Sequence, residues 1–359
     1  MQQIKARLIC AAIAWAVVTG AAAQSAPHKP SAHWAIMVHG GAGDIVRARL
    51  GPAGDAAYRA ALAKVVQAGA QVLDRGGSSL DAVEAAIRVL EDNPLFNAAR
   101  GAVFTAAGKT ELDAAIMDGA TLRAGAVADV THTRYPITLA RAVMEKTPYV
   151  FLVGPGADAF SIQAGMEQAD PSYFFTESRW QSLVKQLQEE GKPIPPRPAG
   201  APPGQALPVA QWQESAGTRR YGTVGVVALD RNGNIAAGTS TGGLQGKMPG
   251  RVGDSPIIGA GTYASNQSCA VSSTGIGEYF IRFTVAREIC ALVQYKGLKL
   301  QQAADQVIHN QLAPIHGDGG VIALTPDGQL AWSFNTSGMF RARLAEGGKI
   351  EVHIYSDEP

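Results

Sequence analysis

The segment GTVGVVALDRNGNIAAGTST, residues 222–241, carries the strongest folding signal in the chain. Residues 224–229 and 235–241 are runs of apolar and small side chains that predict two strands. Between them, residues 230–233 read Asp-Arg-Asn-Gly, a composition typical of a hairpin turn. We therefore expect an antiparallel pair of strands with Thr223 at the head of the first.

Further elements are expected on both sides of this hairpin. Apolar runs predict strands at 35–38, 321–324 and 330–334, and helical spacing of apolar residues predicts helices at 58–73, from Ser78 onward with Asp81 completing an N-terminal cap, and at 278–295. Strands and helices are segregated along the chain instead of alternating strictly. This pattern favours packed sheets with outer helices over a doubly wound parallel sheet.

Composition places the chain among ordinary globular proteins. Of its 359 residues, 46% are hydrophobic and 17% charged, which is enough apolar material for a large core. Length alone suggests about two domains, although one large domain is also compatible with it. The formal net charge is +1, and no long basic run is present, so neither nucleic acid nor an anionic membrane surface is expected as a partner.

Residues 1–23 have the layout of a signal peptide. Lys5 and Arg7 precede an apolar stretch at 8–18, and three alanines follow at 21–23. A membrane anchor is the alternative, but the stretch is short for a bilayer span. We expect an exported, periplasmic protein.

Three cysteines are present, and Cys10 would leave with the signal peptide. Cys269 and Cys290 could pair in an oxidising compartment. Both lie in apolar surroundings, where buried free cysteine is common. Free thiols are therefore the favoured expectation.

Thr223 stands where a cut would create a reactive N-terminus. It follows Gly222 and a Pro-rich segment at 193–208, which predicts a mobile linker. A Thr at the start of a strand is usually only a strand residue. Freed at an N-terminus, however, its hydroxyl is a nucleophile and its own α-amine is a base within reach.

Two later segments supply what such a nucleophile needs. Arg251 and Asp254 lie three residues apart in a Gly-rich loop and suit the carboxylate and ammonium of an amino acid, although a surface ion pair is the alternative. The turn at 273–278 leads into a helix, where backbone N–H groups can stabilise an oxyanion, although it could also be an ordinary turn.

Two Gly-rich segments do not predict nucleotide binding. The segment ending at Lys247 lacks the first Gly and the final Ser or Thr of a phosphate loop. The segment His39-Gly40-Gly41-Ala42-Gly43 follows a strand but lacks the glycine spacing of a dinucleotide-binding turn. No cysteine or histidine pattern typical of a zinc site is present either.

With these segments in order, the chain resembles the plant-type asparaginase/isoaspartyl peptidase family over about residues 34 to 345. The matching segments are 222–230, 240–243, 249–256 and 274–278, together with 39–43, 94–98, 101–104, 111–114, 117–119 and 124–128. So many motifs in one order make the resemblance specific.

The resemblance implies a four-layer αββα fold of the N-terminal-nucleophile (Ntn) hydrolase type, in the α+β class. It implies self-cleavage into an α chain ending at Gly222 and a β chain starting at Thr223, and assembly as a dimer of such heterodimers. The substrate would be L-asparagine or a β-aspartyl dipeptide. The family roles, carried onto this sequence, are Thr223 as nucleophile, Thr241 hydrogen-bonded near it, Thr274 and Gly275 as oxyanion hole, and Arg251, Asp254 and Gly277, with Thr274 and Gly275, as substrate-binding residues.

A structural sodium ion is also implied, with no cofactor for the chemistry. The family holds this ion through backbone carbonyls, which here would belong to Leu90, Glu91, Asn93, Phe96, Ala98 and Arg100. The sequence departs from the family at Ala99 and Arg100, where a Gly and a small or apolar residue are usual. The linker is also longer than the family pattern.

Two alternatives stay open. Glycosylasparaginase shares the fold and mechanism, but such relatives carry Asp where this chain has Gly222. A non-enzymatic exported binding protein that kept the Arg251 and Asp254 pair is the other, and the presence of Thr223, Thr241 and Thr274 argues against it. Asparagine and β-aspartyl dipeptides present the same head group, so the sequence does not rank them.

Overall fold

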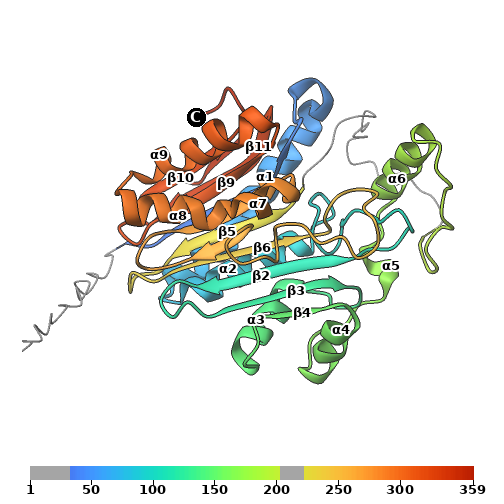
Figure 1. Ribbon diagram of the computed structural model, residues 1–359, viewed down its shortest axis with the longest axis horizontal. Helices are drawn as coiled ribbons and strands as arrows, with labels where there is room; N and C mark the ends of the chain where they lie inside the picture. Colours follow the sequence, from blue (N-terminus) through green and yellow to red (C-terminus); the bar gives the residue numbers. More distant parts are fainter. Residues whose placement is uncertain (1–32, 203–221) are drawn as a thin grey trace, which may run out of the picture.

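The computed structural model describes residues 33–202 and 222–359 (Figure 1). The predicted signal peptide and the part of the predicted linker beyond residue 202 lie outside these residues. The described chain combines sheets and helices, so the expected α+β class is confirmed. No helix within these two ranges is long and apolar enough to cross a membrane.

The larger sheet has eight strands and contains the predicted hairpin at its centre. Its strand order is β12-β11-β1-β5-β6-β2-β3-β4, antiparallel except for the β3–β4 pair. The bounds are β1 Ala35–Gly43, β2 Leu112–Asp118, β3 Ala124–Val130, β4 Phe151–Val153, β5 Val224–Leu229, β6 Ile235–Thr241, β11 Gly338–Ala345 and β12 Glu351–Tyr355. Strands β1, β5 and β6 are buried along their whole length, which explains their unbroken runs of apolar and small residues.

The smaller sheet has four strands in the order β10-β9-β8-β7. The bounds are β7 Thr262–Ala264, β8 Ala270–Gly275, β9 Gly319–Leu324 and β10 Leu330–Phe334. One apolar cluster joins the two sheets face to face, with Met37 and Val227 from the larger sheet packed with Ile322 and Leu324 from the smaller.

Helices cover the outer face of each sheet. The helices α1 Arg47–Asp74, α2 Ser79–Glu91 and α3 Pro136–Lys146 share a core cluster with the larger sheet. The helices α8 Val285–Lys296 and α9 Leu300–Asp305 pack on the smaller sheet, α8 against β8 and α9 against β10 (Figure 1). The remaining helices are α4 Gly154–Gln163, α5 Pro171–Phe174, α6 Glu177–Glu189, α7 Gly277–Phe283, a π-helix at Gln306–Leu312 and a 3₁₀ turn at Ala313–Ile315.

Most local predictions are confirmed, with one clear error. The 230–233 turn is present with Gly233 at φ 79°, and Ser78 Oγ accepts the Asp81 N–H at 3.1 Å as the cap of α2. The single helix expected at 278–295 is wrong, because Thr284 adopts a left-handed conformation with φ 46° and separates α7 from α8. Tertiary contacts hold this break, since the N–H of Arg287 donates to the carbonyl of Gly259 at 2.8 Å.

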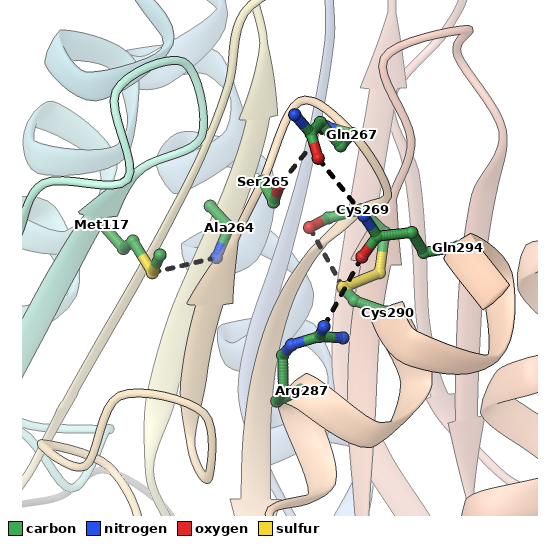
Figure 2. The surroundings of a disulfide bond; sticks show 8 residues. All are labelled: Met117, Ala264, Ser265, Gln267, Cys269, Arg287, Cys290 and Gln294. Atoms are coloured by element: carbon green, nitrogen blue, oxygen red, sulfur yellow. Dashed lines mark hydrogen bonds between the residues drawn. A yellow bond between two sulfur atoms is a disulfide. The ribbon is translucent and has the colours of Figure 1, made fainter. Parts of the chain in front are cut away.

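The expectation of free thiols is also wrong, because Cys269 and Cys290 form a disulfide (Figure 2). Cys269 immediately precedes β8, Cys290 lies on α8, and their Cα atoms are 5.2 Å apart, within the range that a disulfide spans. Both side chains are fully buried. Packing of α8 on the smaller sheet brings the two residues together, and the sequence alone gives no measure of that approach.

Candidate active site

Thr223 lies at the head of β5, between the two sheets. Its side chain is buried, and its hydroxyl donates to Thr241 Oγ1 at 3.1 Å. The β5–β6 register pairs Val224 with Ser240, which places Thr223 opposite Thr241. Ser255 Oγ lies 3.4 Å from Thr223 Oγ1 on another side. The sequence predicted the Thr223–Thr241 pair but missed Ser255, which follows the predicted Asp254 directly.

Asn97 closes the site against the residue before Thr223. A Cβ on Gly222 would lie 2.6 Å from Asn97 Cβ, so only glycine fits there without a shift. Asn97 Nδ2 donates to the carbonyl of Gly243 at 2.8 Å, and its Oδ1 accepts the N–H of Val103 at 2.9 Å. Asn97 is therefore fixed beside the Gly222–Thr223 bond, a position that the sequence analysis did not recognise.

Arg251, Asp254 and Gly277 meet at the start of α7. A Cβ on Gly277 would lie 2.9 Å from Arg251 Nη2 and 3.0 Å from Asp254 Oδ1. The alternative of an ion pair between Arg251 and Asp254 is not what the structure has. Arg251 instead donates from Nε and Nη2 to the two carboxylate oxygens of Glu278, each at 3.0 Å.

Asp254 keeps an unused carboxylate oxygen. The residue is 3% exposed, and its Oδ2 accepts no hydrogen bond from any described residue. Burial raises the pKa of Asp254 to about 7, and the carboxylates of Glu278 and Asp113 add to this, while Arg251 opposes it. A buried acceptor with a raised pKa is suited to a cationic ligand group.

A second buried carboxylate belongs to Asp113 on β2, which pairs with Thr241 on β6. Its Oδ1 accepts the N–H of Asp129 at 3.0 Å, and its Oδ2 has no partner among the described residues. Burial raises the pKa of Asp113, while Lys247 and Arg251 oppose the rise. Asp113 lies in the family-matching segment 111–114, but the sequence assigned it no role.

Thr274 and Gly275 end β8, two residues before Gly277. Thr274 is fully buried, and its Oγ1 accepts the N–H of Ala42 at 3.4 Å. A Cβ on Gly275 would lie 2.5 Å from the Phe280 ring and 2.6 Å from the carbonyl of Asp318. The predicted site residues therefore form two groups, one around Thr223 and one around Asp254. The two groups are close in sequence, because Ser255 follows Asp254 directly and Gly275 lies two residues before Gly277.

The predicted sodium loop follows α2. The carbonyls of Leu90, Glu91 and Asn93 accept backbone hydrogen bonds from Asn93, Arg100 and Phe96, at 3.1, 2.9 and 3.1 Å. Those of Phe96 and Ala98 accept none within the described chain, and both residues are buried. Since each carbonyl has two lone pairs, the loop fits a hard cation held by backbone oxygens. No cluster of three or more His, Cys, Asp or Glu residues in the described ranges could hold a metal ion.

A separate hollow of about 690 Å³ lies elsewhere, between the turns at 119–122, 265–268 and 325–329 and the end of α8. It contains none of the predicted site residues.

The profile of the asparaginase family matches residues 32–354. The chain belongs to the asparaginase family. The chain is 46% identical to the isoaspartyl peptidase of Escherichia coli K12, and the alignment covers 90% of this chain and 96% of that relative. The plant-type L-asparaginase of Pyrococcus furiosus is 42% identical, over 88% and 97%, and the isoaspartyl peptidase/L-asparaginase of Xenopus laevis 39%, over 90% and 96%. The family resemblance seen in the sequence is confirmed, and the asparaginase-family chain is an enzyme, a hydrolase.

Proposed function

We propose that the protein is an amidohydrolase that cleaves L-asparagine, β-aspartyl dipeptides, or both, and releases aspartate. The observation that carries this proposal is the buried group of three hydroxyls, Thr223, Thr241 and Ser255, at the head of β5. The names of the relatives, isoaspartyl peptidase and L-asparaginase, support the same substrates.

Activation begins with cleavage of the Gly222–Thr223 bond. Thr223 Oγ attacks the carbonyl carbon of Gly222, the C–N bond breaks, and the Thr223 nitrogen takes a proton and becomes an amine. Water then hydrolyses the resulting ester and leaves a carboxylate on Gly222. The close approach of Gly222 to Asn97 supports this site, because it restricts where the scissile carbonyl can lie.

The freed Thr223 then acts on the substrate. Its α-amine accepts the hydroxyl proton while Oγ attacks the side-chain carbonyl of the aspartyl group. The hydroxyl of Thr274 and the N–H of Gly275 stabilise the oxyanion. The C–N bond breaks, ammonia or an amino acid leaves with the transferred proton, and a β-aspartyl ester stays on Thr223. Water attacks this ester and releases aspartate.

The head group of the substrate is held by the second group of residues. Arg251 binds the α-carboxylate, and Asp254 binds the α-ammonium through the oxygen that lacks a partner. Glu278 occupies the Nε and Nη2 edge of the guanidinium and leaves Nη1 for the ligand. The glycine at 277 keeps both side chains accessible, because a Cβ there would contact each of them.

Glycosylasparaginase is the second candidate, since it shares the chemistry. Kinetics with one preparation on asparagine, a β-aspartyl dipeptide and a glycosylated asparagine separate the three substrates. We expect turnover of the first two and little of the third, because Gly222 stands where glycosylasparaginases carry Asp.

Three further features belong to the proposal. The carbonyls of the loop at 90–100 hold a structural sodium ion that takes no part in the chemistry.

Two α/β pairs assemble as a dimer of heterodimers, which a sedimentation experiment measures. The protein is exported to the periplasm, and its intact mass from the native host should lack roughly the first 23 to 25 residues.

A denaturing gel with N-terminal sequencing tests the central step. Wild-type protein should give two bands, and the smaller fragment should begin Thr-Val-Gly-Val. The Thr223→Ala variant should stay as one chain without activity. A different N-terminus, or an active Thr223→Ala variant, contradicts the assignment of the nucleophile.

A further inference from the structure

A buried imidazole lies beside strand β5, which begins directly after Thr223. His39 on β1 pairs with Gly225 on β5, two residues beyond Thr223. The ring is fully buried, and its Nε2 lies 2.9 Å from Ser272 Oγ on β8. Burial lowers the pKa of His39 to about 3, and its Nδ1 has no hydrogen-bond partner among the described residues. The ring is therefore neutral, and the proposed chemistry gives it no role.

From Ser272 a chain of hydroxyl groups leads back to the nucleophile. Ser272 Oγ lies 2.7 Å from Thr239 Oγ1, which lies 2.6 Å from Thr262 Oγ1. Thr262 Oγ1 lies 3.1 Å from the carbonyl of Ser255, whose own hydroxyl lies 3.4 Å from Thr223 Oγ1. We call His39, Ser272, Thr239, Thr262 and Ser255 the buried polar chain. It begins beside Gly225 on β5 and ends at the hydroxyl of Thr223.

Gly225 provides the space for this arrangement. A Cβ at that position would lie 1.9 Å from Ser272 Oγ and 2.4 Å from His39 Nε2. Any other residue at 225 would therefore separate the imidazole from the hydroxyl. The glycine beside the nucleophile thus has a local reason: it admits a polar contact between the two sheets.

The members of the buried polar chain come from both sheets and from the loop before β7. His39 and Thr239 belong to the larger sheet, and Ser272 and Thr262 to the smaller. All are fully buried, so each hydrogen bond acts in a medium of low dielectric constant and polarises its neighbours. Such a chain fixes the relative position of the two sheets where they meet at Thr223.

We propose that the buried polar chain is a set of positioning residues that holds the start of strand β5, and with it Thr223, in register with the Ser255 hydroxyl for attack. The proposal rests on the proposed role of Thr223 as nucleophile. None of its members is proposed to bind the substrate head group, so we expect the buried polar chain to act on the rate of the chemical step and not on binding. A misplacement of about 1 Å at the reacting atoms costs on the order of 100-fold in rate.

Two substitutions and their matched controls test this role. Ser272→Ala removes the oxygen that links the imidazole to the rest of the chain, and Thr239→Val removes a hydroxyl at constant shape. We expect kcat to fall about 10- to 100-fold, with KM changed less than about 2-fold. Thr239→Ser restores the hydroxyl and should recover most of the rate. Ser273→Ala removes a neighbouring buried hydroxyl on β8 that bonds the carbonyl of Ala260 instead, and should keep the wild-type kcat.

The N-terminus and the melting temperature of each variant are measured together with the kinetics. A folded Ser272→Ala protein that stays uncut supports the inference, because cleavage and turnover share Thr223. Cut variants with kcat within about 2-fold of wild type overturn the inference. The proposed function would still stand in that case, provided that the wild type is cut into two fragments and is active. If Ser272→Ala does not fold, Thr262→Val replaces it with the same outcomes. If neither variant folds, the buried polar chain serves stability alone, and this result would also overturn the inference.

Discussion

The unpartnered oxygen of Asp254 allows a quantitative test of substrate recognition. Asp254→Asn keeps the shape of the side chain but removes the charge that is proposed to bind the α-ammonium. Burial raises the pKa of Asp254 from 3.8 to about 7, so ionisation in the site costs about 4 kcal/mol more than in water. In the proposed binding mode, the substrate ammonium would compensate this cost. Losing that contact should lower kcat/KM by about 2–4 kcal/mol, or about 30- to 1000-fold.

A cycle that combines the variant with a modified substrate isolates this contact. The kcat/KM values are measured at pH 8 for a β-aspartyl dipeptide and for its N-acetyl derivative, with wild type and with Asp254→Asn. Acetylation should cost the wild type about 30- to 1000-fold and the variant less than about 5-fold, because the carboxylate that senses the ammonium is gone. Equal acetylation penalties in both proteins would remove Asp254 from this role.

The pH dependence of the same residue supplies a control for folding. The folded protein holds a proton on Asp254 that the unfolded chain releases at about 3.8, so the contribution of this carboxyl to stability is lost as pH rises from about 4 to about 7. Asp254→Asn has no such loss. Relative to wild type it should become more stable at pH 8 than at pH 4, by up to about 4 kcal/mol. In wild type, kcat/KM should rise through about pH 7 as Asp254 ionises.

Three other outcomes are expected. Burial raises the pKa of Glu91 from 4.5 to about 8, so the free energy of unfolding should fall between about pH 4.5 and pH 8. Urea unfolding should show this fall in wild type but not in Glu91→Gln, and parallel pH curves for the two proteins would contradict it. Replacing Cys269 and Cys290 by Ala opens a 21-residue separation and should cost about 3 kcal/mol in the same assay, whereas an unchanged unfolding midpoint would deny the bridge a stabilising role. Exhaustive EDTA treatment should leave the rate nearly unchanged; loss of activity that zinc restores would refute the metal-free mechanism.

The parts of the fold that the sequence predicts well are those with a strong local signal. The 224–241 hairpin has unbroken apolar runs and a turn glycine, and α2 has a Ser78 cap, so each is recognisable without tertiary contacts. The break at Thr284 has no such signal, because it is held by hydrogen bonds from the N–H groups of Ala286 and Arg287 to carbonyls of the distant segment 259–260. The disulfide was missed for a similar reason, since pairing depends on how α8 packs.

The same limit applies to the candidate site. The Thr223–Thr241 pair follows from the family resemblance, and the hairpin register places the two residues opposite each other in the structure. Ser255, Asn97 and Asp113 approach the site from loops and a neighbouring strand, and no spacing in the sequence reports those approaches. Glu278 is the most informative case, because it replaces Asp254 as the ion-pair partner of Arg251 and so leaves the aspartate unpaired.

The unpaired buried oxygens around the site have a common physical meaning. A buried polar atom without a partner costs about 1–3 kcal/mol, and more if it is charged, so a folded protein retains few of them. Among the described residues, Asp254 and Asp113 each keep one such oxygen on the side of Thr223 and Thr241. Burial is the largest cause of the raised pKa of each carboxyl group. A cationic head group that reaches Asp254 would remove this cost, so the site is less stable empty than filled. Removing the cost of the unpartnered oxygen would therefore favour binding of the substrate beside the hydroxyl of Thr223.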